Sequence, residues 1–255
     1  MAVKILSDIH GEYGAIKEQL ERDDVAVMLG DYLNLIDFRT MDGILAQVYS
    51  RDEVVRALAL IAKGNKEEAR QQIRATLGGT AEKNQKVREL IVESYEEFFA
   101  SIPCKCFMLY GNTDGPEVMR GFAGGKNELV ESGVVTVGGE RFGMVSGAPH
   151  GPWSVGLPGE METERYNELV ASLGPVDVLC THYPPAVPEL VWDMLGNRDE
   201  VGSTALLAYV DEYAPTYHYF GHVHHPRSSR SDRGRTHLIN AGFFKEHRTA
   251  LTHPA

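Results

Sequence analysis

Short apolar segments rich in β-branched and aromatic residues recur along the chain, and each of them predicts a buried strand. They are VKIL (3–6), VAVML (25–29), CFMLY (106–110), VVTV (134–137), RFGMV (141–145), VDVLC (176–180), YHYF (217–220) and THLIN (236–240). Between them, apolar residues recur with helical spacing, as Leu169, Val170 and Leu173 do. Strands that alternate with helices predict an α/β protein with a largely parallel sheet.

The segment from about 40 to 102 breaks this alternation, because it contains two or three consecutive helical patterns and no strand pattern. Asn65 with Glu68 forms a capping box for one helix, and Thr80 is placed to cap the last one. We therefore predict a helical insertion within a single domain spanning 1–255. The insertion is expected to pack on the core as a helical hairpin. Alternatively, it could cover a substrate site or form the contact of a homo-oligomer.

Polar residues of the kinds that bind metals follow five of the apolar segments. They are Asp8, His10, Asp31, Asn112, His182, His222 and His224. Ligands bind at the carboxyl ends of strands in open α/β sheets, so we expect these side chains to converge. One histidine at a strand end is a weak signal, but the whole set exceeds what a single tetrahedral zinc site uses. It suits two divalent ions that share a carboxylate, with manganese, iron, zinc and nickel as the candidate metals.

The ordered series DIH, GD, GN, TH and GHVH resembles the calcineurin-like metallophosphoesterase superfamily, from Asp8 to His224. The segments SDIHG and LINAGF resemble the small bacterial phosphoesterase branch. The resemblance implies an αββα sandwich of two β-sheets flanked by helices. It also implies two divalent metal ions per chain, and a metal-bound hydroxide as the nucleophile that hydrolyses a phosphate ester.

The resemblance further implies a role for each of the metal-binding residues. The first ion would be held by Asp8, His10, Asp31 and His224. The second would be held by Asp31, Asn112, His182 and His222. In this arrangement Asp31 bridges the two ions, and Asp31 and Asn112 belong to the catalytic machinery.

One position departs from the family motif. The family usually has Gly-Asn-His-Asp or Gly-Asn-His-Glu, in which the histidine contacts the phosphate and can protonate the leaving oxygen, whereas this chain has Thr113. A threonine hydroxyl is no general acid near neutral pH, and losing such an acid typically costs ~10²–10⁴ in rate. Other members of the small bacterial branch that lack this histidine resemble phosphodiesterases. A good leaving group, metal-bound water or another histidine would have to compensate.

Several further residues are candidates for roles near the metals. His150, in the loop GAPHGPW, is the candidate replacement acid, although an ordinary loop histidine is the simpler interpretation. Thr113 and Asp114 are expected to contact the metal ligands without binding a metal themselves. Asn34 either orients a water molecule or caps a turn. The arginine-rich segment 226–236 predicts a solvated hairpin loop, unless one of its arginines reaches the substrate phosphate.

Composition narrows the choice of partner and location. The formal net charge of −11 argues against a broad grip on long nucleic acid, which usually requires a basic face. The start of the chain lacks the pattern of a signal peptide, and no apolar segment approaches the ~18 residues that span a membrane. We therefore expect a cytoplasmic phosphodiesterase acting on a small phosphate ester or a nucleotide, with no membrane partner. The alternatives are a phosphomonoesterase, including a protein phosphatase, and a non-catalytic metal-binding scaffold.

Overall fold

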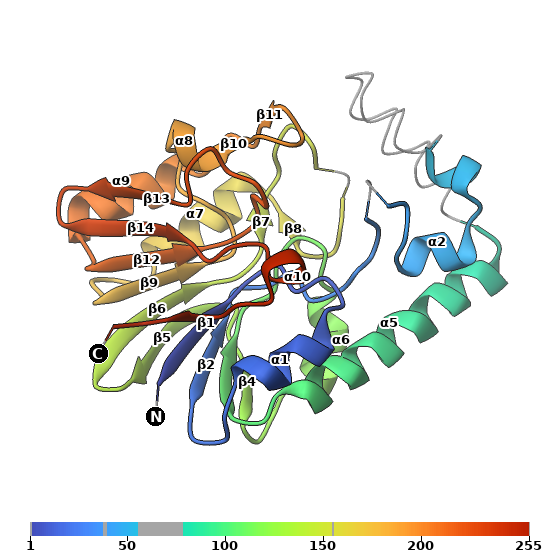
Figure 1. Cartoon of the computed structure of the whole chain (residues 1–255). Helices are drawn as coiled ribbons and strands as arrows, with labels where there is room; N and C mark the ends of the chain where they lie inside the picture. The colour runs from blue at the N-terminus through green and yellow to red at the C-terminus, as the bar shows by residue number, and fades with distance from the viewer. Residues whose placement is uncertain (1, 38–39, 56–78, 155, 255) are drawn as a thin grey trace.

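The structure is a computed structural model that describes residues 2–37, 40–55, 79–154 and 156–254 (Figure 1). Its first sheet has five strands in the order β15-β1-β2-β3-β4. Their bounds are Leu251–Thr252 (β15), Val3–Leu6 (β1), Val25–Met28 (β2), Lys105–Met108 (β3) and Asn127–Leu129 (β4). Strands β1 to β4 are parallel, and β15 pairs antiparallel with β1.

The second sheet has six strands in the order β13-β14-β12-β9-β6-β5. Their bounds are Arg230–Arg233 (β13), Thr236–Asn240 (β14), Tyr217–Phe220 (β12), Val178–Thr181 (β9), Glu140–Val145 (β6) and Ser132–Val137 (β5). The four inner strands are parallel, while β13 and β5 pair antiparallel with their neighbours. Two short strand pairs lie outside both sheets: β7 (Ala148–Pro149) with β8 (Glu160–Met161), and β10 (Trp192–Asp193) with β11 (Arg198–Asp199).

Helices cover the outer face of each sheet, and Figure 1 shows the two helical layers on opposite sides. The first sheet is covered by α1 (Tyr13–Gln19), α5 (Ala81–Ser101) and α6 (Pro116–Phe122). The second is covered by α7 (Thr163–Ala171) and α9 (Thr204–Tyr213). Three shorter helices are α2 (Ile44–Val48), α8 (Pro188–Val191) and α10 (Phe244–His247).

Alternation along the strands produces the layers. In β1, Ile5 packs between the sheets while Leu6 packs against the helices. In β3, Phe107 faces the other sheet and Met108 faces the helices. Because both faces of each sheet are buried, the strands read as continuous apolar segments. The predicted αββα sandwich is confirmed.

All eight apolar segments singled out in the sequence form strands, whereas several shorter strands escaped prediction. The clearest case is β13, which lies inside the arginine-rich segment 226–236. That segment does form a hairpin with β14. Residues Arg230 to Arg233 were expected to lie in a solvated loop, but they pair with β14 as a strand. An exposed edge strand needs no apolar face, so its sequence carries no strand pattern.

The described part of the predicted insertion is helical, comprising α2, residues 51–55 and α5. Thr80 caps α5 as expected, because its hydroxyl accepts the backbone N–H of Lys83 at 3.3 Å. The end of α5 buries Phe98 against the first sheet, so this part of the insertion belongs to the core. The predicted capping box at Asn65 and Glu68 lies outside the described residues. No helix in the part of the chain that the structure describes is both long and apolar enough to cross a membrane.

Candidate metal centre

The structure brings all seven predicted ligand side chains together at the carboxyl ends of five strands. Asp8 and His10 follow β1, Asp31 follows β2, Asn112 follows β3, His182 follows β9, and His222 and His224 follow β12. Strands β1, β2 and β3 belong to the first sheet, while β9 and β12 belong to the second. The centre therefore lies where the two sheets meet at one rim of the sandwich.

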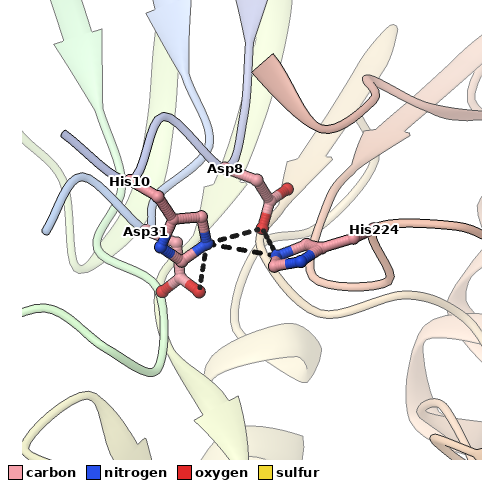
Figure 2. A group of neighbouring side chains, drawn as sticks. All are labelled: Asp8, His10, Asp31 and His224. Atoms are coloured by element: carbon pink, nitrogen blue, oxygen red, sulfur yellow. Dashed lines mark hydrogen bonds and ion pairs between the residues drawn. The ribbon is translucent and has the colours of Figure 1, made fainter. Parts of the chain in front are cut away.

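The first group consists of Asp8, His10, Asp31 and His224, whose donor atoms all lie within 4.8 Å of one another (Figure 2). The Nε2 atoms of His10 and His224 are 3.1 Å apart. His224 Nε2 lies 3.3 Å from Asp8 Oδ1, and His10 Nε2 lies 3.6 Å from Asp31 Oδ2. Two imidazoles and two carboxylates aimed at one point form a nitrogen and oxygen donor set that suits a divalent transition metal.

The second group lies on the other side of Asp31. Asn112 Oδ1 is 2.9 Å from His182 Nε2 and 2.8 Å from His222 Nδ1. His182 Nε2 is also 3.6 Å from Asp31 Oδ1. One oxygen of Asp31 thus faces His10 and the other faces His182, which is the placement that a bridging carboxylate requires.

The hydrogen bonds of two histidines show that their rings turn a lone pair toward the centre, where a cation fits. His10 Nδ1 and His182 Nδ1 each lie 3.0 Å from a backbone oxygen, of Leu33 and Leu29 respectively, and must donate to it. Burial lowers the pKa of both imidazoles, which favours their neutral form with a lone pair on Nε2. In His182 that lone pair faces the side-chain oxygen Oδ1 of Asn112. Two acceptors so close repel each other unless a cation lies between them, so the donor set fits a metal.

Strained backbone aims several of the ligands. Asp8, His10, Asp31 and His222 have positive φ values of 55°, 42°, 57° and 70°. Such values are uncommon outside glycine and gather at functional sites, where the surroundings hold them. Here the backbone N–H of His10 donates to the carbonyl oxygen of Asp31 at 3.0 Å and ties the first two turns together. The ligand turns are therefore fixed by the protein itself.

Two glycines allow the close approach of the ligand turns. A Cβ atom on Gly111 would overlap Asp31 Oδ1 and would lie only 2.7 Å from His182 Cε1. A Cβ atom on Gly221 would overlap Asp8 Oδ2. Only glycine fits at either position, so the Gly-Asn and Gly-His pairs in the sequence have a steric cause.

Asp114 fastens the turn after β2 to the turn after β3. Its carboxylate accepts the backbone N–H groups of Asp31, Tyr32 and Gly111 at 2.8, 3.0 and 2.9 Å. It also accepts the hydroxyl of Tyr95 at 3.3 Å. Burial raises the pKa of Asp114, and the nearby charge of Asp31 adds to the rise. Burying this carboxyl group in its charged form costs free energy. Its presence therefore indicates that its hydrogen bonds are needed to hold the two ligand turns.

A comparison with known protein families bears on both the fold and the site. The family model described as calcineurin-like phosphoesterase matches residues 1–226. The chain belongs to the calcineurin-like phosphoesterase family. As a member of it, this protein is a metal-dependent phosphoesterase.

Solved structures share the fold of this phosphoesterase. One aligns over 96% of this chain and 91% of its own, with 18% identity and a TM-score of 0.57. The TT1561 protein of Thermus thermophilus aligns over 98% and 97%, with 10% identity and a TM-score of 0.50. A search of curated proteins found no significant match.

Three further residues were predicted to act near the metals: Thr113, His150 and Asn34. Thr113 donates its backbone N–H to Asp31 Oδ1 at 2.9 Å, while its buried hydroxyl has no hydrogen-bond partner. The ring of His150 lies 3.2 Å from Glu162 Oε1. The amide of Asn34 donates to Asp42 at 3.0 Å. Among the hydrogen bonds and ion pairs of the described residues, none joins the side chain of His150 or Asn34 to the metal centre, and their roles stay predictions.

Residues that the sequence did not single out also shape the centre. The ring of Phe243 stacks parallel on His224, with the centroids 4.0 Å apart. Asn240 donates its side-chain amide to the carbonyl oxygen of Val223 at 2.9 Å and so fixes the turn between the last two ligands. Both belong to LINAGF, a segment that only family likeness connects with the site. Glu200 lies close to His222 and had no signal at all.

His218 is a buried histidine that contacts Thr181, the residue before the ligand His182. Its Nε2 lies 2.9 Å from Thr181 Oγ1, whose hydroxyl donates to the carbonyl oxygen of Tyr183, so Nε2 carries the proton. Burial lowers the pKa of His218 to about 3. An unfolded histidine titrates near pH ~6.5, so acid protonates only the unfolded state and destabilises the fold.

A His218→Gln variant should therefore lose part of the pH dependence of stability. Between about pH 7 and about pH 5.5 the wild-type free energy of unfolding should fall by about 1 kcal/mol more than that of the variant. Urea unfolding of both metal-stripped proteins measures this difference. Above pH ~7.5 the two should change in parallel, since His218 is neutral in both states. Equal slopes in the acid range would contradict the prediction.

Proposed function

We propose that the phosphoesterase is a dinuclear phosphodiesterase that acts on a small or nucleotide substrate. The observation that carries the dinuclear centre is the position of Asp31, whose two oxygens face two separate groups of donors. Asp8, His10, Asp31 and His224 would hold one ion, and Asp31, Asn112, His182 and His222 the other. Two divalent ions held there would lower the pKa of bound water and would neutralise negative charge on the phosphoryl group.

The contribution of the chain itself is to fix the donors before a substrate arrives. Backbone carbonyl oxygens hold the rings of His10 and His182 with Nε2 turned toward the centre. The backbone N–H of Thr113 holds one oxygen of Asp31. Donors held this way need little rearrangement during the reaction, which is the condition for efficient electrostatic catalysis.

The threonine at position 113 favours a phosphodiester over a phosphomonoester as the substrate. It stands where the family motif has a histidine, and its hydroxyl is buried without a hydrogen-bond partner. Without an acid at this position, expulsion of a poor leaving group such as an alkoxide loses ~10²–10⁴ in rate. Family members that lack this histidine resemble phosphodiesterases, and a good leaving group would make the missing acid less costly.

A pocket beside the first group supports a substrate with a further organic substituent. It has a volume of about 480 Å³, and His224, Met194, Leu195 and Arg227 are among the residues that line it. Met194 and Leu195 are more than half exposed, so they offer apolar surface to a bound molecule. The guanidinium of Arg227 lies on the ring of Trp192, 5.6 Å from its centroid, and offers positive charge. Both features suit a nucleotide or another small ester with an apolar part and an anionic part.

Hydrolysis of bis-p-nitrophenyl phosphate and of p-nitrophenyl phosphate tests the proposal. Metal-stripped protein with manganese added back should hydrolyse the diester with the higher kcat/KM, and chelation should abolish the activity. Both substrates release the same good leaving group, so the comparison reports on the phosphoryl group that the site accepts. Preference for the monoester would favour a phosphatase. Hydrolysis of neither, by protein with two bound ions, would favour a non-catalytic scaffold.

A further inference from the structure

We propose that Glu200 is a positioning residue that holds the proton of His222 on Nε2 and so frees Nδ1 to bind the second ion. The inference rests on the proposed function, since it takes His222 as a ligand. Glu200 stands between β11 and α9, and only 7% of it is exposed. It is thus a buried carboxylate beside the metal centre but outside the ligand set.

The two ring nitrogens of His222 face different partners. Nδ1 lies 2.8 Å from Asn112 Oδ1, on the side of the second group. Nε2 lies 3.8 Å from Glu200 Oε2, on the opposite side of the ring. A metal can bind Nδ1 only when the proton is on Nε2, because neutral imidazole has one lone pair. A carboxylate facing Nε2 favours that tautomer.

Two other histidines of the centre explain why His222 needs a carboxylate. His10 and His182 bind their Nδ1 protons to backbone carbonyl oxygens and turn Nε2 toward the centre. His222 is reversed, because it turns Nδ1 toward the centre. Glu200 takes the role of the carbonyl oxygen for His222 through its negative charge, because 3.8 Å is longer than a hydrogen bond. Such partners of ligand histidines fix the tautomer and the ring orientation.

The surroundings of Glu200 leave one of its oxygens for His222. Arg198 Nε donates to Oε1 at 2.6 Å, and the guanidinium of Arg198 lies 5.1 Å from the centroid of the Trp153 ring. The hydroxyl of Tyr183 donates to the carbonyl oxygen of Glu200 at 2.7 Å and fixes its backbone. The ion pair with Arg198 offsets the cost of burying the carboxylate. Oε2 then remains directed at the imidazole.

Calorimetric titration of metal-stripped protein with Mn²⁺ tests the inference. Wild-type protein should bind two equivalents. Glu200→Gln keeps the shape of the side chain and loses its charge, so the second equivalent should bind about 10- to 100-fold more weakly, while the first is unchanged. Glu200→Asp retains the charge and should bind the second ion more tightly than Glu200→Gln does. Glu140→Gln is the matched control, because Glu140 pairs with His253 at 2.9 Å outside the centre.

The outcomes separate the inference from the function on which it rests. Wild-type affinity for both ions in Glu200→Gln would overturn the role of Glu200 and leave the dinuclear site standing. Equal weakening of both ions, with a lower urea midpoint of the metal-stripped variant, would show that Glu200 only stabilises the fold and would also overturn the inference. Fewer than two ions in the wild type would instead overturn the proposed dinuclear function. If Glu200→Gln does not fold, the ¹⁵N chemical shifts of the His222 ring in the zinc-loaded wild type decide: a proton on Nδ1 would overturn the inference.

Discussion

Replacement of Asp31 by asparagine is expected to lower kcat/KM for a phosphodiester by about 10³-fold or more. Asp31 Oδ2 faces His10 and Asp31 Oδ1 faces His182, both at 3.6 Å, so one substitution weakens both groups of donors. Asparagine tolerates the positive φ of 57° at this position, and the turn should survive. Hydrolysis of bis-p-nitrophenyl phosphate with added manganese measures the loss, and metal analysis after dialysis counts the ions retained.

Asp232→Asn is the matched control for this substitution. Asp232 lies in β13, is exposed, and pairs with the ring of His237 at 2.7 Å. Its replacement should leave activity and metal content at the wild-type level. An Asp31→Asn protein that retained two ions and more than about a tenth of the wild-type kcat/KM would show that Asp31 does not bridge the two groups.

Replacement of Asp114 by alanine is expected to lower the free energy of unfolding by about 3–5 kcal/mol. The carboxylate accepts the backbone N–H groups of Asp31, Tyr32 and Gly111, and alanine would leave all three buried donors unpaired. Each unpaired buried donor costs about 1–3 kcal/mol, less whatever the turns recover by relaxing. Urea unfolding of the metal-stripped protein measures the change without a contribution from bound metal.

Asp114→Asn refines this prediction because the amide keeps one accepting oxygen. Oδ2 of Asp114 serves Asp31 and Gly111, whereas Oδ1 serves Tyr32. An amide oxygen placed at Oδ2 would keep the first two bonds and lose the third, so the destabilisation should be intermediate. An alanine variant within about 1 kcal/mol of the wild type would show that the two ligand turns are held by other contacts.

The sequence predicted the strands well for a physical reason. Both sheets are buried on two faces, so residues such as Ile5 and Leu6 are both apolar although they point in opposite directions. Parallel strands also end at the same rim, which is why the polar residues that follow them could be expected to converge. Edge strands lack this signal: β13 reads RSDR and is mostly exposed, and it is held by its pairing with β14 and by polar contacts such as that of Arg233 with Asp211.

Loop packing set the limit of prediction within the site. Glu200 approaches His222 only because β10, β11 and the chain after them fold back over the rim, an arrangement with no periodic trace in the sequence. The pairing of His150 with Glu162 likewise depends on the parallel pairing of β7 with β8, two strands too short to predict. The stacking of Phe243 on His224 required knowing that the chain after β14 returns to the centre. Motifs identified the donors and also Asp114, whereas the positions of Glu200 and Phe243 could be identified only from the fold.

The donors of the first group lie far apart along the chain, and this fixes an order of events during synthesis. His10 and His224 are separated by 214 positions. N-terminal segments fold first as a polypeptide leaves the ribosome, so Asp8, His10 and Asp31 emerge long before the strand that carries the last ligand. A nascent chain holds an incomplete site until residue 224 has been made and has emerged. A site that needs all four donors is therefore complete only after most of the second sheet has been made.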